Sequence, residues 1–476
     1  MLLIDHEWRA ASSGATFNVY NPATGALLDT VADASVDDAT AAIAAAQTAF
    51  KSWSKQTAYA RAQVLYRAYE LMLAKKEALA QLMTAEQGKP LKAARNEVQY
   101  AADFLLWFAE EAKRVYGAVI PSARADQRFM TLKQAVGVVV AITPWNYPIS
   151  MITRKLAPAL AAGCTVVLKP AEETPLCARA VVEILIEAGL PTGVVNVINS
   201  SQPALIGEVL LSHPKVKKVT FTGSTEVGKA IAAKAAEQVK SVSMELGGHA
   251  PFIVCADADP VHAAKGLALV KFLNTGQACI SPNRVFVHRS LLDAFVATLI
   301  QRVRQLKAGN GLEDGVSIGP LVSAAAVAKV AAQVADAQAK GATVLLGGEA
   351  LTEGALAQGH YYAPTVLTNV TPDMLIYREE TFGPVAAIIA FDDEDDVIEM
   401  ANDTEYGLAA YIYTHRLDTA LHAFEDLNFG IIGINDINPT AAAAPFGGMN
   451  ESGLGREGGQ EGIDAYLQTK LGGFSI

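Results

Sequence analysis

The sequence predicts an α/β protein built around parallel sheets, and three observations point to that class. From position 135 onward, short apolar runs of strand length alternate with amphipathic runs of helix length, and a second alternation of this kind begins after Gly248. Strands that are apolar throughout occur where helices cover a sheet on both faces, so each alternation indicates a parallel sheet in its own domain. The composition, 51% hydrophobic and 18% charged, is typical of a globular chain of this length, 476 residues.

Helical periodicity dominates the first quarter of the chain. An alanine-rich amphipathic segment comes first, and apolar side chains at three- and four-residue spacings then predict one long helix over 58–85. Gly88 and Pro90 end that helix, and the next one continues to Arg114. Two segments of β character follow, at 115–120 and 128–133.

The first alternation predicts buried strands at 135–142, 164–168, 194–198, 216–221 and 241–244. Helices are expected between them, at 150–161, 176–188, 203–211 and 225–238. The second alternation places strands at 251–255, 284–288 and 342–346. Beyond it lie a glycine-rich loop and a short extended tail at 466–470.

Charge and targeting signals exclude several classes of protein. Lys and Arg number 38 and Asp and Glu 49, so the net charge is 38 − 49 = −11, and a chain without a basic cluster is not expected to bind nucleic acid. No basic segment precedes an apolar core at the N-terminus, so we expect no signal peptide. The uncharged stretch 134–153 is interrupted by Pro144, Asn146 and Pro148, which favours a strand and loop over a membrane span.

The four cysteines (Cys164, Cys177, Cys255 and Cys279) do not have the spacing of a disulfide framework or of a zinc site. We therefore expect no structural metal and a reducing compartment, the cytoplasm. Three of the four lie among apolar residues and are expected to be inert and buried. Cys279 differs because it follows the small N-T-G-Q loop at 274–277, where Gly276 allows close backbone approach. A thiolate there can act as a nucleophile, with backbone N–H groups facing an oxyanion.

Two more segments carry residues suited to acyl chemistry. In S-M-E-L-G-G-H (243–249), Glu245 ends an apolar strand, where partial burial raises a carboxyl pKa toward the range of a general base; the alternative is a residue that ties down the Gly-Gly backbone. In I-T-P-W-N-Y-P (142–148), Asn146 offers a neutral amide donor to an oxyanion, or is simply a turn residue between prolines.

Three segments have the form of nucleotide-binding turns. In V-L-K-P-A-E-E-T-P (167–175), Lys169 and Glu172 follow a strand end and can hold ribose hydroxyls, unless this is an ordinary solvated loop. In F-T-G-S-T-E-V-G-K (221–229), Gly223 and Ser224 open a helix whose N-terminus suits a pyrophosphate. The segment lacks the Lys-Ser/Thr pair of a P-loop, and this excludes a P-loop nucleotide hydrolase. The segment R-E-E-T-F-G-P-V (378–385) places two acids before an aromatic residue, to hold a ribose or to form a surface turn.

Taken together and in this order, these segments resemble the aldehyde dehydrogenase superfamily across nearly the whole chain. The resemblance implies a Rossmann-type cofactor domain, an α/β catalytic domain and a small β oligomerisation arm. Through N-T-G-Q-A-C, M-E-L-G-G and P-W-N-Y-P it implies that Cys279 is the nucleophile, Glu245 the base and Asn146 the oxyanion donor. The cofactor contacts it implies are Trp145, Lys169, Glu172, Gly223, Ser224, Glu380 and Phe382. The C-terminal segment P-F-G-G-M-N-E-S-G-L-G-R-E also matches, and implies that Glu457 is a second proton carrier.

The implied reaction is oxidation of an aldehyde to a carboxylic acid. Cys279 attacks the aldehyde carbon, hydride passes to the nicotinamide, and Glu245 activates the water that hydrolyses the thioester. Because Glu172 accepts from a ribose 2′-OH but repels a 2′-phosphate, NAD is expected rather than NADP. Intact Cys279, Asn146 and Glu245 argue against an inactive structural protein, and Glu245 argues against a CoA-acylating enzyme.

The substrate is expected to be a small aldehyde, with two classes left open. C-I-S-P-N-R (279–284) and E-Q-G-K-P-L (86–91) resemble the bacterial succinate- and 2-oxoglutarate-semialdehyde dehydrogenases, in which a basic residue at the position of Arg154 meets the distal carboxylate; Tyr147 is expected to contact the substrate as well. Those enzymes carry a second arginine where this chain has Leu273, and the alanines at 441–444 supply no hydroxyls. A neutral aliphatic or aromatic aldehyde is therefore the alternative substrate.

The resemblance also implies how the chain is divided into domains. The NAD-binding domain is expected to comprise residues 1–112 and 136–246, and the catalytic domain residues 247–445. An oligomerisation arm is expected from 113–135 and 446–476, because exposed strand edges need a partner. A homodimer or a homotetramer is consistent with such an arm.

Overall fold

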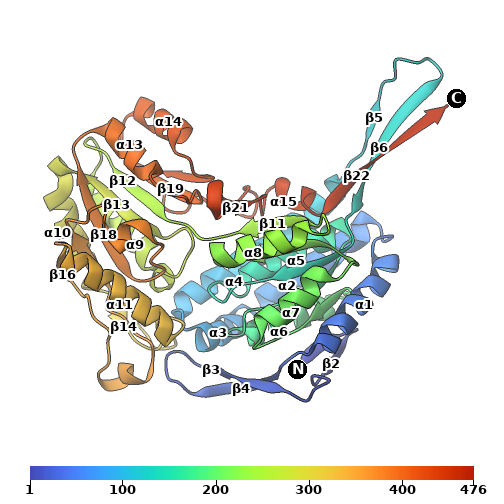
Figure 1. The fold of residues 1–476 in the computed structure, drawn as a ribbon, viewed down its shortest axis with the longest axis horizontal. Coiled ribbons are helices and arrows are strands. Elements are labelled where there is room, and N and C mark those ends of the chain that lie inside the picture. Colours follow the sequence, from blue (N-terminus) through green and yellow to red (C-terminus); the bar gives the residue numbers. More distant parts are fainter.

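The computed structural model describes residues 1–476, with side chains for all but residue 395. Figure 1 shows two lobes, each built on a sheet covered by helices, and a thin arm that projects from one of them. The larger lobe contains most of the first half of the chain, and the other contains most of the second half.

The larger lobe is organised around an eight-stranded sheet. Its central strands are parallel and run in the order β9 (Val195–Val197), β8 (Thr165–Lys169), β7 (Val138–Ile142), β10 (Val216–Thr222) and β11 (Ser241–Glu245). One edge is extended by β1 (Leu2–Ile4) and β2 (Glu7–Arg9), and the other by β21 (Gly453–Leu454). The order changes direction at β7, so the crevice beside this strand is where a ligand of such a sheet binds.

Helices cover both faces of this sheet, as the apolar runs predict. Alternate residues of each strand face opposite ways: Val139 and Val166 pack among α2–α6, whereas Val138 and Val167 pack among α1, α7 and α8. The helices are α1 (Val36–Trp53), α2 (Ala58–Ala74), α3 (Lys76–Gln87), α4 (Leu91–Glu111), α5 (Ser150–Ala162), α6 (Pro175–Glu187), α7 (Pro203–Ser212), α8 (Thr225–Ala236) and the short α15 (Glu461–Asp464).

The second lobe contains a seven-stranded sheet. Its order is β16 (Thr343–Leu346), β17 (Thr365–Thr368), β18 (Val385–Phe391), β13 (Pro282–His288), β12 (Ala250–Val254), β19 (Ala409–Tyr413) and β20 (Ile431–Ile434), parallel except for β16. The helices of this lobe are α9 (Pro260–Phe272), α10 (Leu292–Val303), α11 (Ala324–Ala339), α12 (Leu375–Arg378), α13 (Glu394–Asn402) and α14 (Leu417–Asp426), and a two-stranded sheet joins β14 (Lys307–Ala308) to β15 (Val316–Ile318).

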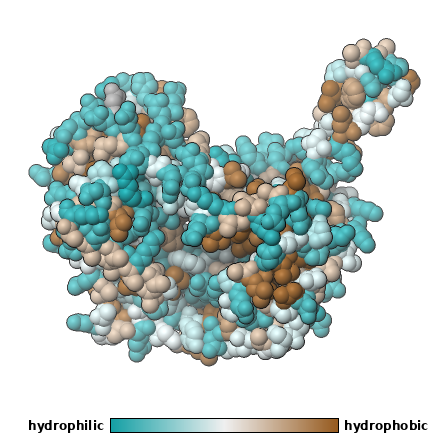
Figure 2. All heavy atoms as spheres, in the orientation of Figure 1, coloured by the Kyte–Doolittle hydropathy of each residue, from teal (hydrophilic) through white to brown (hydrophobic). Residues whose placement is uncertain are grey.

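The arm is a three-stranded antiparallel sheet of β5 (Ala118–Ile120), β6 (Gln127–Ala135) and the C-terminal β22 (Leu467–Ser475). Its large apolar side chains are exposed, among them Val119, Met130, Leu132, Leu471 and Phe474, and Figure 2 shows apolar atoms on the arm. Only part of the predicted range 446–476 lies in this arm, because β21 pairs with β11 in the larger sheet and α15 packs on α5.

One sequence-based expectation about the first quarter is wrong, and none of its strands was predicted from the sequence. The helix predicted over 58–85 is two helices, which meet at Lys75, where the backbone leaves helical geometry at φ −98° and ψ 12°. Four strands also precede α1: β1, β2, β3 (Thr16–Tyr20) and β4 (Leu27–Ala32). A strand as short as β1 has no periodicity of its own; it pairs with the adjacent β2 and, through Leu3 and Val197, with β9 far along the chain.

Candidate active site

The residues predicted to carry the chemistry lie on segments that leave the two sheets near one crevice. Asn146 follows β7, Glu245 is the last residue of β11, and Cys279 precedes β13. Strands β7 and β11 are parallel and both border β10, so their carboxyl ends lie at the same edge of the sheet. Glu245 hence lies close to the turn that carries Asn146.

The nucleophile loop has an unusual backbone. Asn274, Thr275 and Gly276 are consecutive residues with left-handed φ of 49°, 59° and 76°. A Cβ on Gly276 would lie 2.1 Å from the carbonyl oxygen of Gly383, so this position accepts only glycine. The Thr275 hydroxyl donates to the Gly319 carbonyl at 3.1 Å and accepts from its N–H at 3.0 Å. These contacts hold a strained loop in one conformation.

Asn146 is fixed against that loop by its side chain and its backbone. Its Nδ2 donates to the Gln277 carbonyl at 3.1 Å, and its own carbonyl accepts from Asn274 Nδ2 at 2.9 Å. Within the part of the chain that the structure describes, its Oδ1 has no hydrogen-bond partner. The Asn146 amide is therefore hydrogen-bonded to a residue two positions before Cys279, and its donor group faces the nucleophile loop.

Glu245 is buried, and neither carboxylate oxygen has a hydrogen-bond partner among the described residues. Burial raises the pKa of Glu245 well above its usual value, and the charge of Glu457 raises it further. Arg154 and Lys155 act in the opposite direction. A raised pKa makes the ionised carboxylate a stronger proton acceptor, which suits a general base.

Cys279 is half-buried, whereas the other three cysteines are fully buried free thiols. Burial raises the pKa of the Cys279 thiol to about 12, the charge of Arg154 lowers it, and Glu380 and Glu245 raise it. The sulfur is thus protonated at neutral pH, and forming the nucleophile requires a base. Glu245 is the group whose raised pKa suits that transfer.

Arg154, predicted to bind the substrate, lies in α5 and is almost fully buried. Its Nε is 3.0 Å from Glu457 Oε2, and Lys155 Nζ donates to the other oxygen of Glu457 at 2.5 Å. The guanidinium carbon lies 4.0 Å above the Phe446 ring. Its Nη2 has no hydrogen-bond partner among the described residues. Glu457 therefore neutralises part of the charge, and one guanidinium nitrogen is left unpaired.

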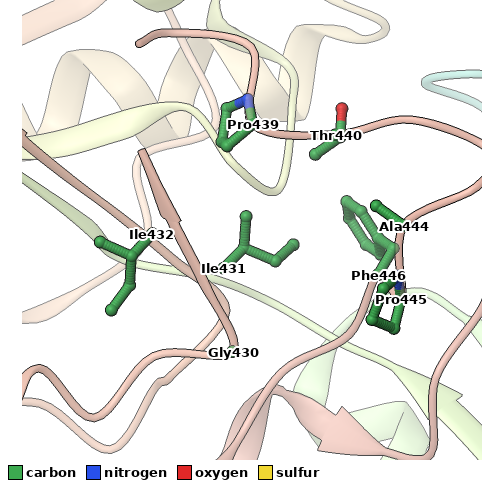
Figure 3. Close-up of a pocket in the computed structure, with 8 residues that line it drawn as sticks. All are labelled: Gly430, Ile431, Ile432, Pro439, Thr440, Ala444, Pro445 and Phe446. Carbon is green, nitrogen blue, oxygen red and sulfur yellow. The ribbon is translucent and has the colours of Figure 1, made fainter. Parts of the chain in front are cut away.

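A cavity of about 190 Å³ lies on Phe446, the ring that Arg154 covers. Figure 3 shows the residues that line it, whose side chains are apolar apart from the hydroxyl of Thr440; they are Gly430, Ile431, Ile432, Pro439, Thr440, Ala444, Pro445 and Phe446. Leu273, where the resemblance calls for an arginine, is 45% exposed.

The predicted ribose and pyrophosphate residues lie at the carboxyl ends of β8 and β10. Lys169 ends β8 and its Nζ is 3.4 Å from Glu172 Oε2. Ser224 is the N-cap of α8, and its hydroxyl accepts from the Val227 N–H at 3.4 Å. Gly223, just before it, donates its N–H to the Glu245 carbonyl at 3.1 Å. This backbone hydrogen bond connects the turn at Gly223 to β11, the strand that ends at Glu245.

Glu380 and Phe382 lie nearer the reacting residues. Glu380 Oε1 accepts from the Gly248 N–H at 2.9 Å, and burial raises the Glu380 pKa to about 7. A Cβ on Gly248 would lie 2.3 Å from the Cys279 carbonyl oxygen, so Gly248 lies directly against the nucleophile. The rings of Trp145 and Phe382 meet edge to face, with centroids 5.6 Å apart. The helix N-terminus at Ser224 and the aromatic pair at Trp145 suit the pyrophosphate and a planar ring of a dinucleotide, respectively.

The Lys89 and Glu97 side chains are fully buried beside this site, and the motif analysis did not single them out. Lys89 Nζ donates to the Asn146 carbonyl at 2.7 Å. One feature of the sequence could have identified Glu97, namely a charged residue at a position where the helix pattern expects an apolar one. Glu97 lies on the face of α4 that also carries buried Ala94, Val98 and Ala101.

One group of side chains could hold a metal ion, formed by Cys255, Asp257 and Glu394. Asp257 there already accepts hydrogen bonds from the Thr414 hydroxyl and the His415 N–H. The expectation of no structural metal stays a prediction.

The comparisons with known proteins agree with this geometry. The model of the aldehyde dehydrogenase family matches residues 8–471. The chain belongs to the aldehyde dehydrogenase family. It is an oxidoreductase that acts on aldehydes, and the family's cofactors are NAD and NADP.

Its relatives include enzymes for several acidic aldehydes. It is 49% identical to the NADP-dependent succinate-semialdehyde dehydrogenase GabD of Escherichia coli, over 98% of this chain and 96% of the relative. It is also 49% identical to 3-sulfolactaldehyde dehydrogenase of Pseudomonas putida, over 99% and 96%. A crystal structure of an Escherichia coli NADP-dependent enzyme matches with a TM-score of 0.98 and 48% identity, over 100% of this chain and 98% of that one. Among the described residues, none of the helices is both long and apolar enough to cross a bilayer.

Proposed function

We propose that this aldehyde dehydrogenase oxidises a small aldehyde to its carboxylic acid through a covalent intermediate on Cys279. The observation that supports this most is the bond from Asn146 Nδ2 to the Gln277 carbonyl, which fixes an amide donor beside the nucleophile loop. An unpaired, buried Glu245 completes the set of nucleophile, base and oxyanion donor.

The proton of the Cys279 thiol passes to Glu245, and the sulfur forms a bond to the aldehyde carbon. The resulting alkoxide accepts a hydrogen bond from the Asn146 amide. A nicotinamide dinucleotide, when bound, accepts the hydride that this carbon loses. The thiohemiacetal on Cys279 thereby becomes a thioester. Glu245 next releases the thiol proton to solvent and takes a proton from water, and the hydroxide attacks the thioester. The acid leaves, and the proton held by Glu245 returns to the Cys279 sulfur to restore the thiol.

The cofactor is held by residues at the ends of β8, β10 and α12. Lys169 and Glu172 bind the adenosine ribose, Ser224 and the N-terminus of α8 that follows Gly223 bind the pyrophosphate, and Glu380 binds the nicotinamide ribose. NAD is preferred to NADP because the Glu172 carboxylate repels a 2′-phosphate.

The substrate is an acidic semialdehyde with four or five carbons. Arg154 meets its distal carboxylate with the unpaired Nη2, and the name of the succinate-semialdehyde dehydrogenase relative supports such a substrate. A charge-assisted bond of this kind contributes about 1.5–3 kcal/mol.

A neutral aldehyde is the second candidate, and specific observations favour it. Glu457 neutralises part of the charge of Arg154, the side chains around the cavity on Phe446 are apolar apart from Thr440, and exposed Leu273 adds apolar surface.

The experiment that tests the function compares kcat/KM for succinate semialdehyde with that for butanal, followed by NADH absorbance. An acidic substrate predicts at least about a tenfold preference for the semialdehyde, whereas a preference for butanal would select the second candidate. Mass spectrometry of the product, with and without added CoA, distinguishes the acid from an acyl-CoA ester.

The assembly is a homodimer or a homotetramer held through the arm. Its strands β5 and β22 are the edges of a sheet with exposed apolar side chains, which are costly in an isolated molecule. Four reduced cysteines fit the cytoplasm. Sedimentation of the wild-type chain and of Leu471→Asp tests the role of the arm.

A further inference from the structure

The Lys89–Glu97 ion pair lies outside every motif that carries the chemistry. Lys89 follows the helix end at Gly88, Glu97 lies on the next helix, α4, and both side chains have no exposed surface. Burying two charges costs free energy that a well-packed apolar pair avoids, so the pair calls for an explanation other than stability.

Both charged groups bond to the segment that carries Asn146. Lys89 Nζ donates to Glu97 Oε2 and to the Asn146 carbonyl, the latter at 2.7 Å. Glu97 Oε1 accepts from the N–H groups of Ile149 and Ser150, at 3.0 and 3.1 Å, at the start of α5. The ion pair therefore holds the turn from the Asn146 carbonyl to the first residue of that helix.

The ammonium group also orients the neighbouring ring. Lys89 Nζ lies 4.0 Å from the centre of the Tyr147 ring. The Asn146 carbonyl accepts from Lys89 Nζ and from Asn274 Nδ2, so two donors fix the plane of this peptide group. The orientation of this peptide plane sets the direction of the Asn146 side chain. The position of the donor Nδ2 depends on that direction.

The backbone around Lys89 lies against the frame of the nucleophile loop. A Cβ on Gly319 would lie 2.1 Å from the Gly88 carbonyl oxygen, and a Cβ on Gly311 2.6 Å from the Lys89 carbonyl oxygen. Gly319 is the residue bonded twice to Thr275 of the nucleophile loop. One short segment is thus packed against both sides of the oxyanion site, with Asn146 on one side and the loop of Cys279 on the other.

We infer that Lys89 and Glu97 are positioning residues for the reaction, and that they act through Asn146 by holding its amide where the oxyanion forms. This inference rests on the proposed function, which makes Asn146 the oxyanion donor. Preorganised donors of this kind stabilise the transition state more than the bound substrate. The effect of the pair is therefore expected in kcat rather than in the KM for either substrate.

The test compares Lys89→Met and Glu97→Gln with Lys92→Met, an exposed lysine on the same helix as Glu97. Each of the first two is expected to lower kcat by about 10- to 100-fold, since a displacement near 1 Å costs that much. The KM for the cofactor is expected to change less than about twofold, because the groups proposed to bind it are elsewhere. Thermal unfolding identifies any variant that does not fold, and Glu97→Gln, which keeps the acceptor oxygen, is the milder of the two.

A double-mutant cycle with Asn146→Ala identifies the route of the effect. Asn146→Ala alone is expected to lower kcat by about 10²–10³-fold. If Lys89 acts through Asn146, adding Lys89→Met to Asn146→Ala lowers kcat by less than about threefold. Full additivity, or an unchanged kcat in both folded single variants, would overturn the inference. An unchanged kcat in Asn146→Ala itself would instead overturn the oxyanion role in the proposed function.

Discussion

The two ends of the crevice are built in different ways. At the nucleophile loop, the side chains of Asn146, Gln277 and Thr275 donate hydrogen bonds to backbone carbonyls of the second lobe, and Gly276 is tightly enclosed. At the distal end, Arg154 is joined to Glu457 and lies on Phe446, and Thr440 has the one side-chain hydroxyl in the lining of the cavity on that ring. In the proposed function, rigid polar contacts determine which reaction is catalysed, whereas a few adjustable side chains determine which aldehyde enters.

The largest expected effect is at the rigid end. Cys279→Ala removes the atom that forms the covalent bond, so kcat is expected to fall by at least about 10⁴-fold. Steady-state NADH formation measures the loss, and Cys177→Ala, at a buried cysteine of α6, is the control. Substantial turnover in folded Cys279→Ala would show that Cys279 is not the nucleophile.

A second prediction concerns the protonation of that sulfur. Because burial raises the Cys279 pKa to about 12, the thiolate fraction rises with pH throughout the range 6.5 to 9. The rate of alkylation by iodoacetamide is expected to rise about tenfold per pH unit there, in the absence of cofactor. Mass spectrometry identifies the modified residue, and a plateau below pH 8 would show that the free enzyme holds a thiolate.

The distal end is altered by Leu273→Arg, with Leu273→Met as the matched control. A guanidinium placed there adds a charge-assisted hydrogen bond to a carboxylate, so kcat/KM for succinate semialdehyde is expected to rise about 10- to 100-fold. The value for butanal is expected to stay the same or fall. Equal changes for both substrates would mean that residue 273 does not contact the distal group.

The smallest expected effect is on cofactor choice. Glu172→Ser removes a carboxylate, so the ratio of kcat/KM for NADP to that for NAD is expected to rise about tenfold. The maximal rate with NAD should change little, because Glu172 is proposed to touch only the adenosine ribose. If the wild-type enzyme prefers NADP to NAD, that result alone contradicts the proposed role of Glu172.

The sequence predicts best where chemistry depends on a few contiguous residues. The strand ends that carry Glu245, Asn146 and Lys169 were predicted because apolar runs and the polar residues after them are local features. The pairing of Arg154 with Glu457 was not, because it joins positions about 300 residues apart. The same limit applies to the place of β1 in the large sheet, which depends on its pairing with the distant β9. Lys89 and Glu97 are near in sequence, but their proposed role depends on contact with the turn at Asn146, and hydrophobic periodicity does not predict where that turn lies.

The last thirty residues of the chain have a consequence for how the enzyme is made. Phe446 and Glu457 pair with each other by backbone, β21 completes the sheet beside Glu245, and β22 completes the arm. Lys155 and Arg154 are synthesised some three hundred residues earlier than the carboxylate that balances them. During translation these two cations have no buried partner until residue 457 is made, so the surroundings of Glu245 form only after that point.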